Sequence, residues 1–391
     1  MRKKNKHTNV FTKLMSTSKE KIVSVGIDVS KVEFAVSITL YSLMSQTFRQ
    51  LTRFTEDNTP AGIGKEIKKI RSKASQNGHC SVRVTMEATG VYYEELALRL
   101  FDRHREYHVS VMLPSKAKKL IEGMGNRSKT DRVDADALAQ CGAERRLEAW
   151  KGIDPYWREL RSLTRTREEL QNQKTRLENQ IHALTHSGSE AELALESYAV
   201  CLEAIKRQVD VLTTQSKAHL RKNKAVWKQV KDLESIPGIG MVTIAAILAE
   251  TNGFTDFTSI GQLISFSGYD VKLRESGKWK GQSRISKQGN SHIRRAMYMP
   301  AMSVSGKVKT GPIREFYDRL AAREGVKGTK MKAQVALQKK LLTYMFILWK
   351  KKERFNPDII DRDRKGRNKK VASPIGETTG DMTTITLPSF A

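Results

Sequence analysis

The sequence predicts an α/β domain followed by all-α segments, and three patterns along the chain predict it. Residues 21–150 alternate β-branched apolar runs with helix-forming segments, which is typical of a layered, partly parallel sheet. Residues 151–225 carry apolar side chains at the spacing of two long helices. Residues 226–352 again favour helices, whereas 353–391 are charged and then rich in Ser and Thr, which predicts a disordered tail.

The elements expected in the α/β part follow from these runs. The expected strands are residues 21–30, 34–40, 46–54, 81–87 and 108–114, and the expected helices are 60–75, 92–103 and 131–147. The first strands are joined by short links, so we expect an antiparallel hairpin at one edge of the sheet. Residues 1–20 are basic and are predicted to form a flexible arm.

The segment 151–225 is predicted to be a helical hairpin or coiled coil. Its apolar seams are Leu160, Leu163, Leu170, Leu177, Ile181 and Leu184, then Leu195, Tyr198, Leu202, Ile205, Val209 and Leu212. A break at Ser187-Gly188-Ser189 separates the two helices. Narrow apolar seams need a partner, which favours self-association into a homo-oligomer; a plain spacer is the alternative.

Composition favours a polyanionic partner. The 391 residues include 70 Lys and Arg against 42 Asp and Glu, a net charge of +28. Such an excess favours salt-dependent binding to nucleic acid, although charge also keeps basic proteins soluble. Three widely spaced cysteines fit reduced thiols and not a disulfide framework. The apolar stretch 341–349 is too short to span a bilayer, and no signal peptide is recognised, so we expect no membrane partner and a cytoplasmic location.

Four acidic residues are the main candidates for chemistry. Asp28 and Glu87 each end an apolar run that reads as a strand, and Asp131 and Asp134 share one face of a helix. Asp136 on that helix should point elsewhere. Carboxylates gathered in one place repel each other unless a divalent cation lies between them, and Mg²⁺ prefers such oxygen ligands. Two such ions can activate a nucleophile and stabilise a leaving oxygen in phosphodiester chemistry.

A basic stretch at 268–302 is the second candidate site. Residues expected to bind nucleic acid here and beside the acids are Lys278, Lys280, Arg284, Lys287, Arg294 and Arg295, with Lys129 and Arg132. Lys272 and Arg274 add to the same charge. Trp279 and Tyr298 offer flat surfaces on which a base can stack.

Two further features accompany the basic stretch. Ser276 precedes a glycine in an expected turn, so its hydroxyl is a candidate nucleophile, whereas Ser286 could cap a turn or hold a phosphate; most loop serines are merely solvated. The segment Pro237-Gly238-Ile239-Gly240 opens an Ala-rich helix. There Gly238 and Gly240 would let backbone amides approach a phosphate, with a plain loop as the alternative at even odds.

The motifs together resemble one known family. They are GIDVSK (26–31), EATGVY (87–92), KTDRVDA (129–135), IPGIG (236–240) and SGKWKGQSRISKQGNSHIRRAMYMPA (276–301). In this order they resemble the DEDD transposases and site-specific DNA recombinases of the Piv and MooV type, which include recombinases guided by a bridge RNA. The resemblance covers roughly 22–142 and 232–305.

The resemblance implies a RuvC-like, RNase-H-type fold in which Asp28, Glu87, Asp131 and Asp134 bind Mg²⁺. It also implies a C-terminal transposase domain whose serine, here Ser276 with Ser286 as the reserve, forms a phosphoserine link to cleaved DNA. The implied partners are target and donor double-stranded DNA, a structured guide RNA and further copies of the chain, up to a tetramer. Two rivals remain: a RuvC-like Holliday-junction nuclease that uses metal-activated water, and a non-enzymatic nucleic-acid-binding protein.

Overall fold

The chain folds into two compact units, Met1–Asp154 and Pro155–Ala391. The structure is a computed structural model, and it describes residues 21–78, 80–102, 106–125, 130–187, 192–272, 275–276, 279–281, 284–323 and 328–358. The predicted basic arm and the predicted tail beyond residue 358 lie outside these ranges. Each unit is described by itself.

The first unit is built on a five-stranded sheet of order β3-β2-β1-β4-β5. The strands are β1 (Lys21–Val29), β2 (Glu33–Ser42), β3 (Thr47–Asp57), β4 (Ser81–Glu87) and β5 (Tyr107–Met112). β1, β2 and β3 pair antiparallel, whereas β1–β4 and β4–β5 pair parallel. The predicted mixed sheet with an antiparallel edge is therefore confirmed.

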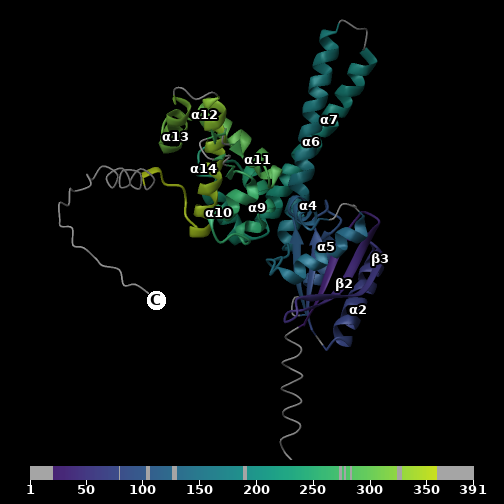
Figure 1. The fold of residues 1–391 in the computed structure, drawn as a ribbon. Coiled ribbons are helices and arrows are strands. Elements are labelled where there is room, and N and C mark those ends of the chain that lie inside the picture. Colours follow the sequence, from purple (N-terminus) through teal and green to yellow (C-terminus); the bar gives the residue numbers. More distant parts are fainter. Residues whose placement is uncertain are drawn as a thin grey trace, which may run out of the picture. The chain divides into compact units, whose positions relative to one another are not determined.

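The two faces of this sheet are chemically different. The face that carries Val23, Val25 and Ile27 packs against α2 (Pro60–Gln76) and α3 (Glu94–Phe101) in an apolar core. The opposite face of β1 carries Ser24 and packs against α5 (Asp131–Glu144), whose buried residues are mostly small. Small residues let the helix and the strand approach closely, and α5 lies against the sheet in Figure 1.

The sequence patterns did not predict α4 (Pro114–Gly123). This helix begins with a proline in its first turn, and Ala117 is its only buried residue. Ala117, Leu120 and Ile121 do lie on one face at helical spacing, but a pattern that covers a single helical turn or two is too short to stand out in the sequence.

The second unit begins with two long antiparallel helices, α6 (Pro155–His186) and α7 (Glu192–Arg221), which project as a hairpin (Figure 1). The predicted seam residues of both helices are buried or half-buried. At the root of the hairpin, His219 Nε2 lies 2.9 Å from the carbonyl oxygen of Tyr156. The seams pack against each other within one chain, so they do not by themselves require a second copy, and self-association stays a prediction.

The rest of the second unit is a helical core. Its helices are α8 (Lys224–Leu233), α9 (Met241–Glu250), η1 (Asn252–Phe254), α10 (Ile260–Ser267), α11 (Ser291–Ala296), α12 (Tyr298–Lys307), α13 (Pro312–Ala321) and α14 (Thr329–Lys351). Trp157 and Leu160 of α6 join this core with Leu220 of α7, which anchors the root of the hairpin. None of the helices in the described ranges has the length and apolar character needed to cross a membrane.

Candidate active site

The ends of two neighbouring parallel strands carry the first two acids. Ile27 of β1 pairs with Met86 of β4, so the next residues along, Asp28 and Glu87, lie at the same level of the sheet. Both side chains are half-buried. Parallel strands end at the same edge, and therefore two residues far apart in the sequence meet there.

Glycines in β1 and α5 fix how the helix crosses the sheet. A Cβ on Gly26 would overlap the carbonyl oxygen of Ala135 and the amide nitrogen of Ala139, and one on Gly142 would overlap Thr85 Oγ1. The hydroxyl of Ser24 donates a hydrogen bond of 2.6 Å to the carbonyl oxygen of Ala139. The helix backbone thus lies directly on the strands, with no layer of large side chains between them.

These contacts also give the direction of α5. Ser24 lies at the level of Ala139, and Gly26 lies between Ala139 and Ala135. Four residues along the helix advance about 6 Å, and two residues along the strand advance about 6.6 Å. Each step of two residues along β1 therefore corresponds to a step of about four residues back along α5. The next residue on this face, Asp28, therefore lies toward the first turns of α5. By the same alternation, Glu87 shares this face with Thr85.

The first turn of α5 supplies the other two acids. Thr130 is the N-cap and accepts a hydrogen bond of 3.3 Å from the amide of Val133. Asp131 is exposed, whereas Asp134 is only 9% exposed. Acids in the first turn are stabilised by the positive end of the helix dipole. Asp136 pairs at 2.8 Å with Arg53 of β3, so it does point elsewhere, as predicted.

The four acids fit a divalent cation by the chemistry of their donors, which are all carboxylate oxygens at one edge of the sheet. Within the described ranges, no three acidic, histidine or cysteine side chains already converge on one point. Carboxylates without a cation between them repel one another. The contacts of β1 and β4 with α5 direct the two strand ends toward the acidic first turn of the helix.

Gly26→Ala tests this close packing through stability. The added methyl group meets backbone atoms of α5, which cannot rotate away, so we expect a loss in the free energy of unfolding near the upper end of the usual 1–3 kcal/mol for overpacking, about 3 kcal/mol. Hydrogen exchange of amides in β1 and α5 measures it. Gly64→Ala is the matched control, since a Cβ there meets nothing within 4 Å and should stabilise α2 slightly. Equal protection in Gly26→Ala and wild type would contradict the packing argument.

Ser276 lies on a small hairpin in the second unit. β6 (Val271–Lys272) pairs with β9 (Arg284–Ile285), and β7 (Glu275–Ser276) pairs with β8 (Trp279–Lys280). Within this pair of strands Ser276 lies opposite Trp279. Lys278, Arg274 and Lys129 lie outside the described residues, and for Lys280 only its place in β8 is given.

The reserve serine has a different environment. The hydroxyl of Ser286 donates a hydrogen bond of 2.5 Å to Asp270 Oδ1 and accepts one of 3.2 Å from the amide of Gln288. Its amide also donates to the carbonyl oxygen of Asp270, at 2.7 Å. Asp270 and Ser286 flank β6 and β9, so this contact closes the base of the hairpin that carries Ser276.

The remaining candidates for nucleic-acid binding differ in their contacts. Arg132, Arg284 and Lys287 are exposed. Arg294 donates from Nη1 to three backbone carbonyls, of which that of Ser267 is the nearest at 2.8 Å, so it holds the loop before α11. Arg295 pairs with Glu168 of α6 at 2.5 Å. No sequence pattern had linked these two residues, which are 127 positions apart.

The two glycines before α9 also differ. Gly238 has a φ of +82°, and a Cβ there would lie 2.8 Å from the carbonyl oxygen of Pro300, so the backbone requires glycine at this position. Gly240 is the exposed N-cap of α9, and a Cβ there would meet nothing within 4 Å. Of the two, Gly240 leaves the amides of the helix N-terminus open to a phosphate.

Comparison with known proteins adds two family matches. Residues 25–187 match the family DEDD_Tnp_IS110, described as a transposase, and residues 230–318 match the Transposase IS116/IS110/IS902 family. The first match holds all four acids, and the second holds the glycines before α9 and the Ser276 hairpin.

Named relatives agree with these matches. The pilin gene-inverting protein of Moraxella bovis is 26% identical over 292 residues, which cover 71% of this chain and 83% of that protein, and the Moraxella lacunata protein of the same name gives the same figures. The transposase for insertion sequence element IS1111A of Coxiella burnetii (strain RSA 493 / Nine Mile phase I) is 27% identical over 205 residues, covering 46% of this chain and 56% of its own length. The chain belongs to the IS110/IS116 family of insertion-sequence transposases and site-specific recombinases, enzymes that cleave and rejoin DNA.

Proposed function

We propose that this transposase cleaves and exchanges strands of target and donor DNA with Mg²⁺ held by four carboxylates and with a serine nucleophile. The observation that carries the proposal is the placement of Asp28 and Glu87 at neighbouring strand ends beneath the acidic first turn of α5. Membership of a DEDD transposase family implies the use of a divalent metal.

Asp28, Glu87, Asp131 and Asp134 would hold the metal. When bound, Mg²⁺ would supply positive charge that stabilises the oxygen leaving the phosphorus. The chain contributes a site with one buried wall, since Asp134 is 9% exposed and the strand ends are half-buried. Such a site excludes part of the bulk water, which strengthens the electrostatic interactions within it.

Ser276 is the proposed nucleophile. Its Oγ–phosphorus bond forms as a phosphorus–oxygen bond of the DNA strand breaks, and the released deoxyribose oxygen takes up the proton that the serine loses. Rejoining reverses these changes with a hydroxyl from the other duplex. Ser276 lies in the short β7–β8 pair, whereas the hydroxyl of Ser286 is engaged with Asp270 beside β6 and β9, which favours Ser276 for the role.

A structured guide RNA and further copies of the chain complete the proposal. The net charge of +28 exceeds what one phosphodiester site requires and suits several nucleic-acid strands. The α6–α7 hairpin offers a long surface for a second copy. Exposed apolar residues on α7, such as Leu193 and Val200, support an association there beyond the seam.

The test is capture of the covalent intermediate. Labelled DNA carrying the element's ends is incubated with the full chain, its guide RNA and Mg²⁺, and protein–DNA adducts that survive denaturation are counted and mapped by mass spectrometry. We expect Ser276→Ala to form no adduct, while Ser286→Ala forms it at a reduced level because its hairpin is less well held.

Two outcomes would contradict the serine assignment. Normal cleavage by Ser276→Ala without an adduct would favour hydrolysis by metal-activated water. An adduct that persists in Ser276→Ala and disappears in Ser286→Ala would move the role to the reserve serine.

A further inference from the structure

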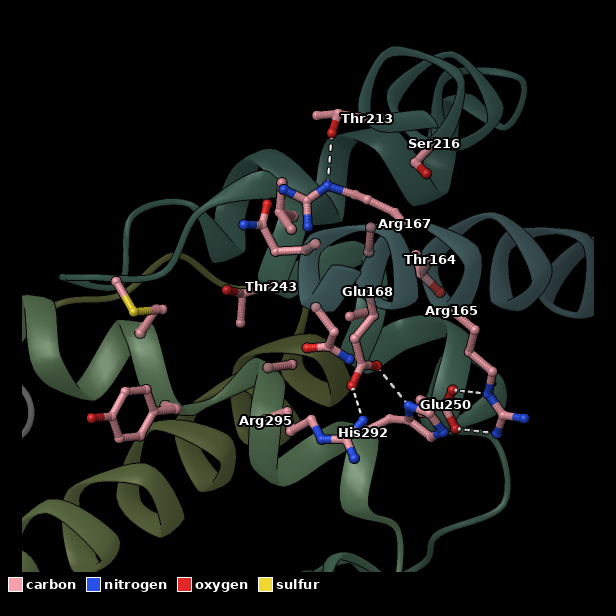
Figure 2. A pocket seen from close by; sticks show the side chains of 18 of the residues that line it. Thr164, Arg165, Arg167, Glu168, Thr213, Ser216, Thr243, Glu250, His292 and Arg295 are labelled. Carbon is pink, nitrogen blue, oxygen red and sulfur yellow. Dashed lines mark hydrogen bonds and ion pairs between the residues drawn. The ribbon is translucent and has the colours of Figure 1, made fainter. Parts of the chain in front are cut away.

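A cavity of about 730 Å³ lies at the root of the α6–α7 hairpin, within the second unit (Figure 2). Its walls come from α6, α7, α9, α11 and the start of α12. The volume is within the range of roughly 300–1,000 Å³ that small-ligand sites occupy. Neither the four acids nor Ser276 belongs to its lining, so it is separate from the proposed chemistry.

One wall of the cavity is apolar and flat. It is made by Met241, Ala245 and Ala246 of α9 with Ala296 and Met299. Small side chains on a helix expose a broad surface without filling the space above it. Tyr298 also lines the cavity, and its side chain is 52% exposed. The wall suits the flat face of a base.

The two acids in the lining already have partners of their own. Glu168 accepts from His292 Nδ1 at 2.6 Å and from Arg295 Nη1 at 2.5 Å (Figure 2). Burial alone would raise the pKa of Glu168, but these two hydrogen bonds and the charges behind them outweigh it, and the pKa lies below its ordinary value. Glu168 is therefore an ionised, satisfied carboxylate.

The second acid, Glu250, is paired in the same way. Glu250 accepts two hydrogen bonds from Arg165, at 2.7 and 2.9 Å, and one of 2.6 Å from Asn290. Burial opposes its ionisation, yet the bonds from Arg165 and Asn290 keep its pKa below its ordinary value. The lining holds three arginines and two glutamates, so the arginines outnumber the carboxylates by one.

The additional arginine is Arg167. Arg167 precedes Glu168 on α6, so the two side chains leave the helix about 100° apart. Figure 2 shows the Arg167 side chain directed toward Thr213. Its Nε donates a hydrogen bond of 2.7 Å to Thr213 Oγ1, and within the described part of the chain it forms no ion pair. Burial lowers the pKa of Arg167, and the charge of Asp210 offsets this only in part.

A half-buried guanidinium that no carboxylate contacts directly is costly unless an anion approaches it. Its terminal NH groups form a planar fork that matches two phosphate oxygens. Gln171, Asn172 and Thr175 add polar groups to the lining on the same helix. An apolar wall beside such an arginine is complementary to a nucleotide.

We propose that this cavity receives one unpaired nucleotide of a bound nucleic-acid strand, with its base on the α9 wall and its phosphate on Arg167. The inference rests on the proposed function for the presence of such a strand. A base pair within a duplex cannot enter a concave site of this size, so the nucleotide must be single-stranded or turned out of its helix. Both DNA and RNA carry this chemistry.

The test compares nucleic acids of one sequence in four forms: single-stranded DNA, single-stranded RNA and the two corresponding duplexes. Their affinities for the full-length chain are measured by fluorescence anisotropy at several salt concentrations. We expect Arg167→Gln to weaken binding of one single strand about tenfold, and to reduce its salt dependence by about one phosphate contact, while duplex binding changes less than about twofold. The strand that responds more identifies the source of the nucleotide.

Two further variants keep the result interpretable. Arg176→Gln is the matched control, because Arg176 is an exposed arginine on the same helix outside the cavity lining, and it should change every affinity less than about twofold. Ala246→Leu fills the wall without touching Arg167 and should also weaken single-strand binding. Crosslinking from a strand that contains 4-thiouridine or 4-thiothymidine should mark Met299 or Tyr298 in wild type, and less so in Ala246→Leu.

Unchanged single-strand affinity in both Arg167→Gln and Ala246→Leu would overturn the inference, as would an equal loss for duplexes. Adduct formation at Ser276 is assayed in parallel. If adducts form normally but the cavity variants bind like wild type, the cavity inference alone fails. If wild type forms no adduct while the cavity variants lose single-strand affinity, the proposed chemistry fails and the nucleotide site stands.

Discussion

Asp28→Asn is expected to lower the rate of DNA strand cleavage on the order of a thousandfold or more, and Asp134→Asn to do the same. Asparagine keeps the shape of aspartate but removes the charge that a divalent cation needs. Binding of DNA should stay within about twofold, because the basic surfaces that attract phosphates are unchanged. Rates are measured on labelled DNA with Mg²⁺ and with the guide RNA that the proposed function includes.

The same helix offers the control. Asp136 differs from Asp134 by two positions and is paired with Arg53, an exposed ion pair of the kind that contributes little stability. Asp136→Asn should therefore cleave like wild type. If Asp136→Asn loses activity as fully as Asp134→Asn, a general disturbance of α5 would explain both, and the metal-site interpretation would fail.

A second measurement does not depend on activity. Ligands that bind only the folded state raise its stability in proportion to the logarithm of their concentration. Millimolar Mg²⁺ or Mn²⁺ should protect the amides of β1 and α5 from hydrogen exchange in wild type and in Asp136→Asn. The same ions should give no protection in Asp28→Asn. Protection of Asp28→Asn equal to that of wild type would place the cation elsewhere.

How much of this site the sequence could predict depended on the range of the interaction. The β-branched runs and the helical connections predicted the mixed sheet. The two-residue spacing of Asp134 and Asp136 on one helix predicted that their side chains diverge. Gly26 stood in a recognised motif, but only the structure gives its physical role, which is to let the backbone of α5 lie against β1. A contact between backbone atoms more than 100 residues apart leaves no periodic pattern in the chain.

The second unit illustrates the same limit. The seam periodicity predicted two long helices, but periodicity cannot say whether a seam is covered by the same chain or by another. The pairing of Glu168 with Arg295 and His292 joins α6 of the hairpin to α11. Arg295 was therefore predicted to bind nucleic acid, and the sequence patterns gave no role to Arg167.

Glu66 gives the second large expected effect. It lies on α2, on the sheet face opposite the acids, and its side chain is fully buried. Neither of its carboxylate oxygens has a hydrogen-bond partner within the described residues. Burial, and then the negative charge of Glu56, raise the pKa of Glu66 to about 8, with Lys69 opposing. Lys69 is itself engaged with Glu56 at 2.6 Å.

The direction of the pH effect follows from this raised pKa. In the unfolded chain Glu66 ionises near its ordinary value of 4.5, whereas in the folded protein it keeps its proton up to about pH 8. Between these values the folded state holds one more proton than the unfolded state, so stability falls as the pH rises. At about 1.4 kcal/mol per pH unit, the loss approaches 5 kcal/mol by pH 8. Below pH 4.5 the contribution is fully retained.

Glu66→Gln removes the titration while keeping a neutral side chain of the same shape. We expect this variant to match wild type near pH 5 and to exceed it by several kcal/mol near pH 8, and only the difference between the two proteins is assigned to Glu66. Because the chain has two units, hydrogen exchange of amides in α2 and β1 is the suitable measurement. Glu122→Gln, at an exposed position on α4, should leave the slope unchanged. If wild type and Glu66→Gln share one pH dependence, Glu66 is ionised in the fold, and a compensating cation must reach it.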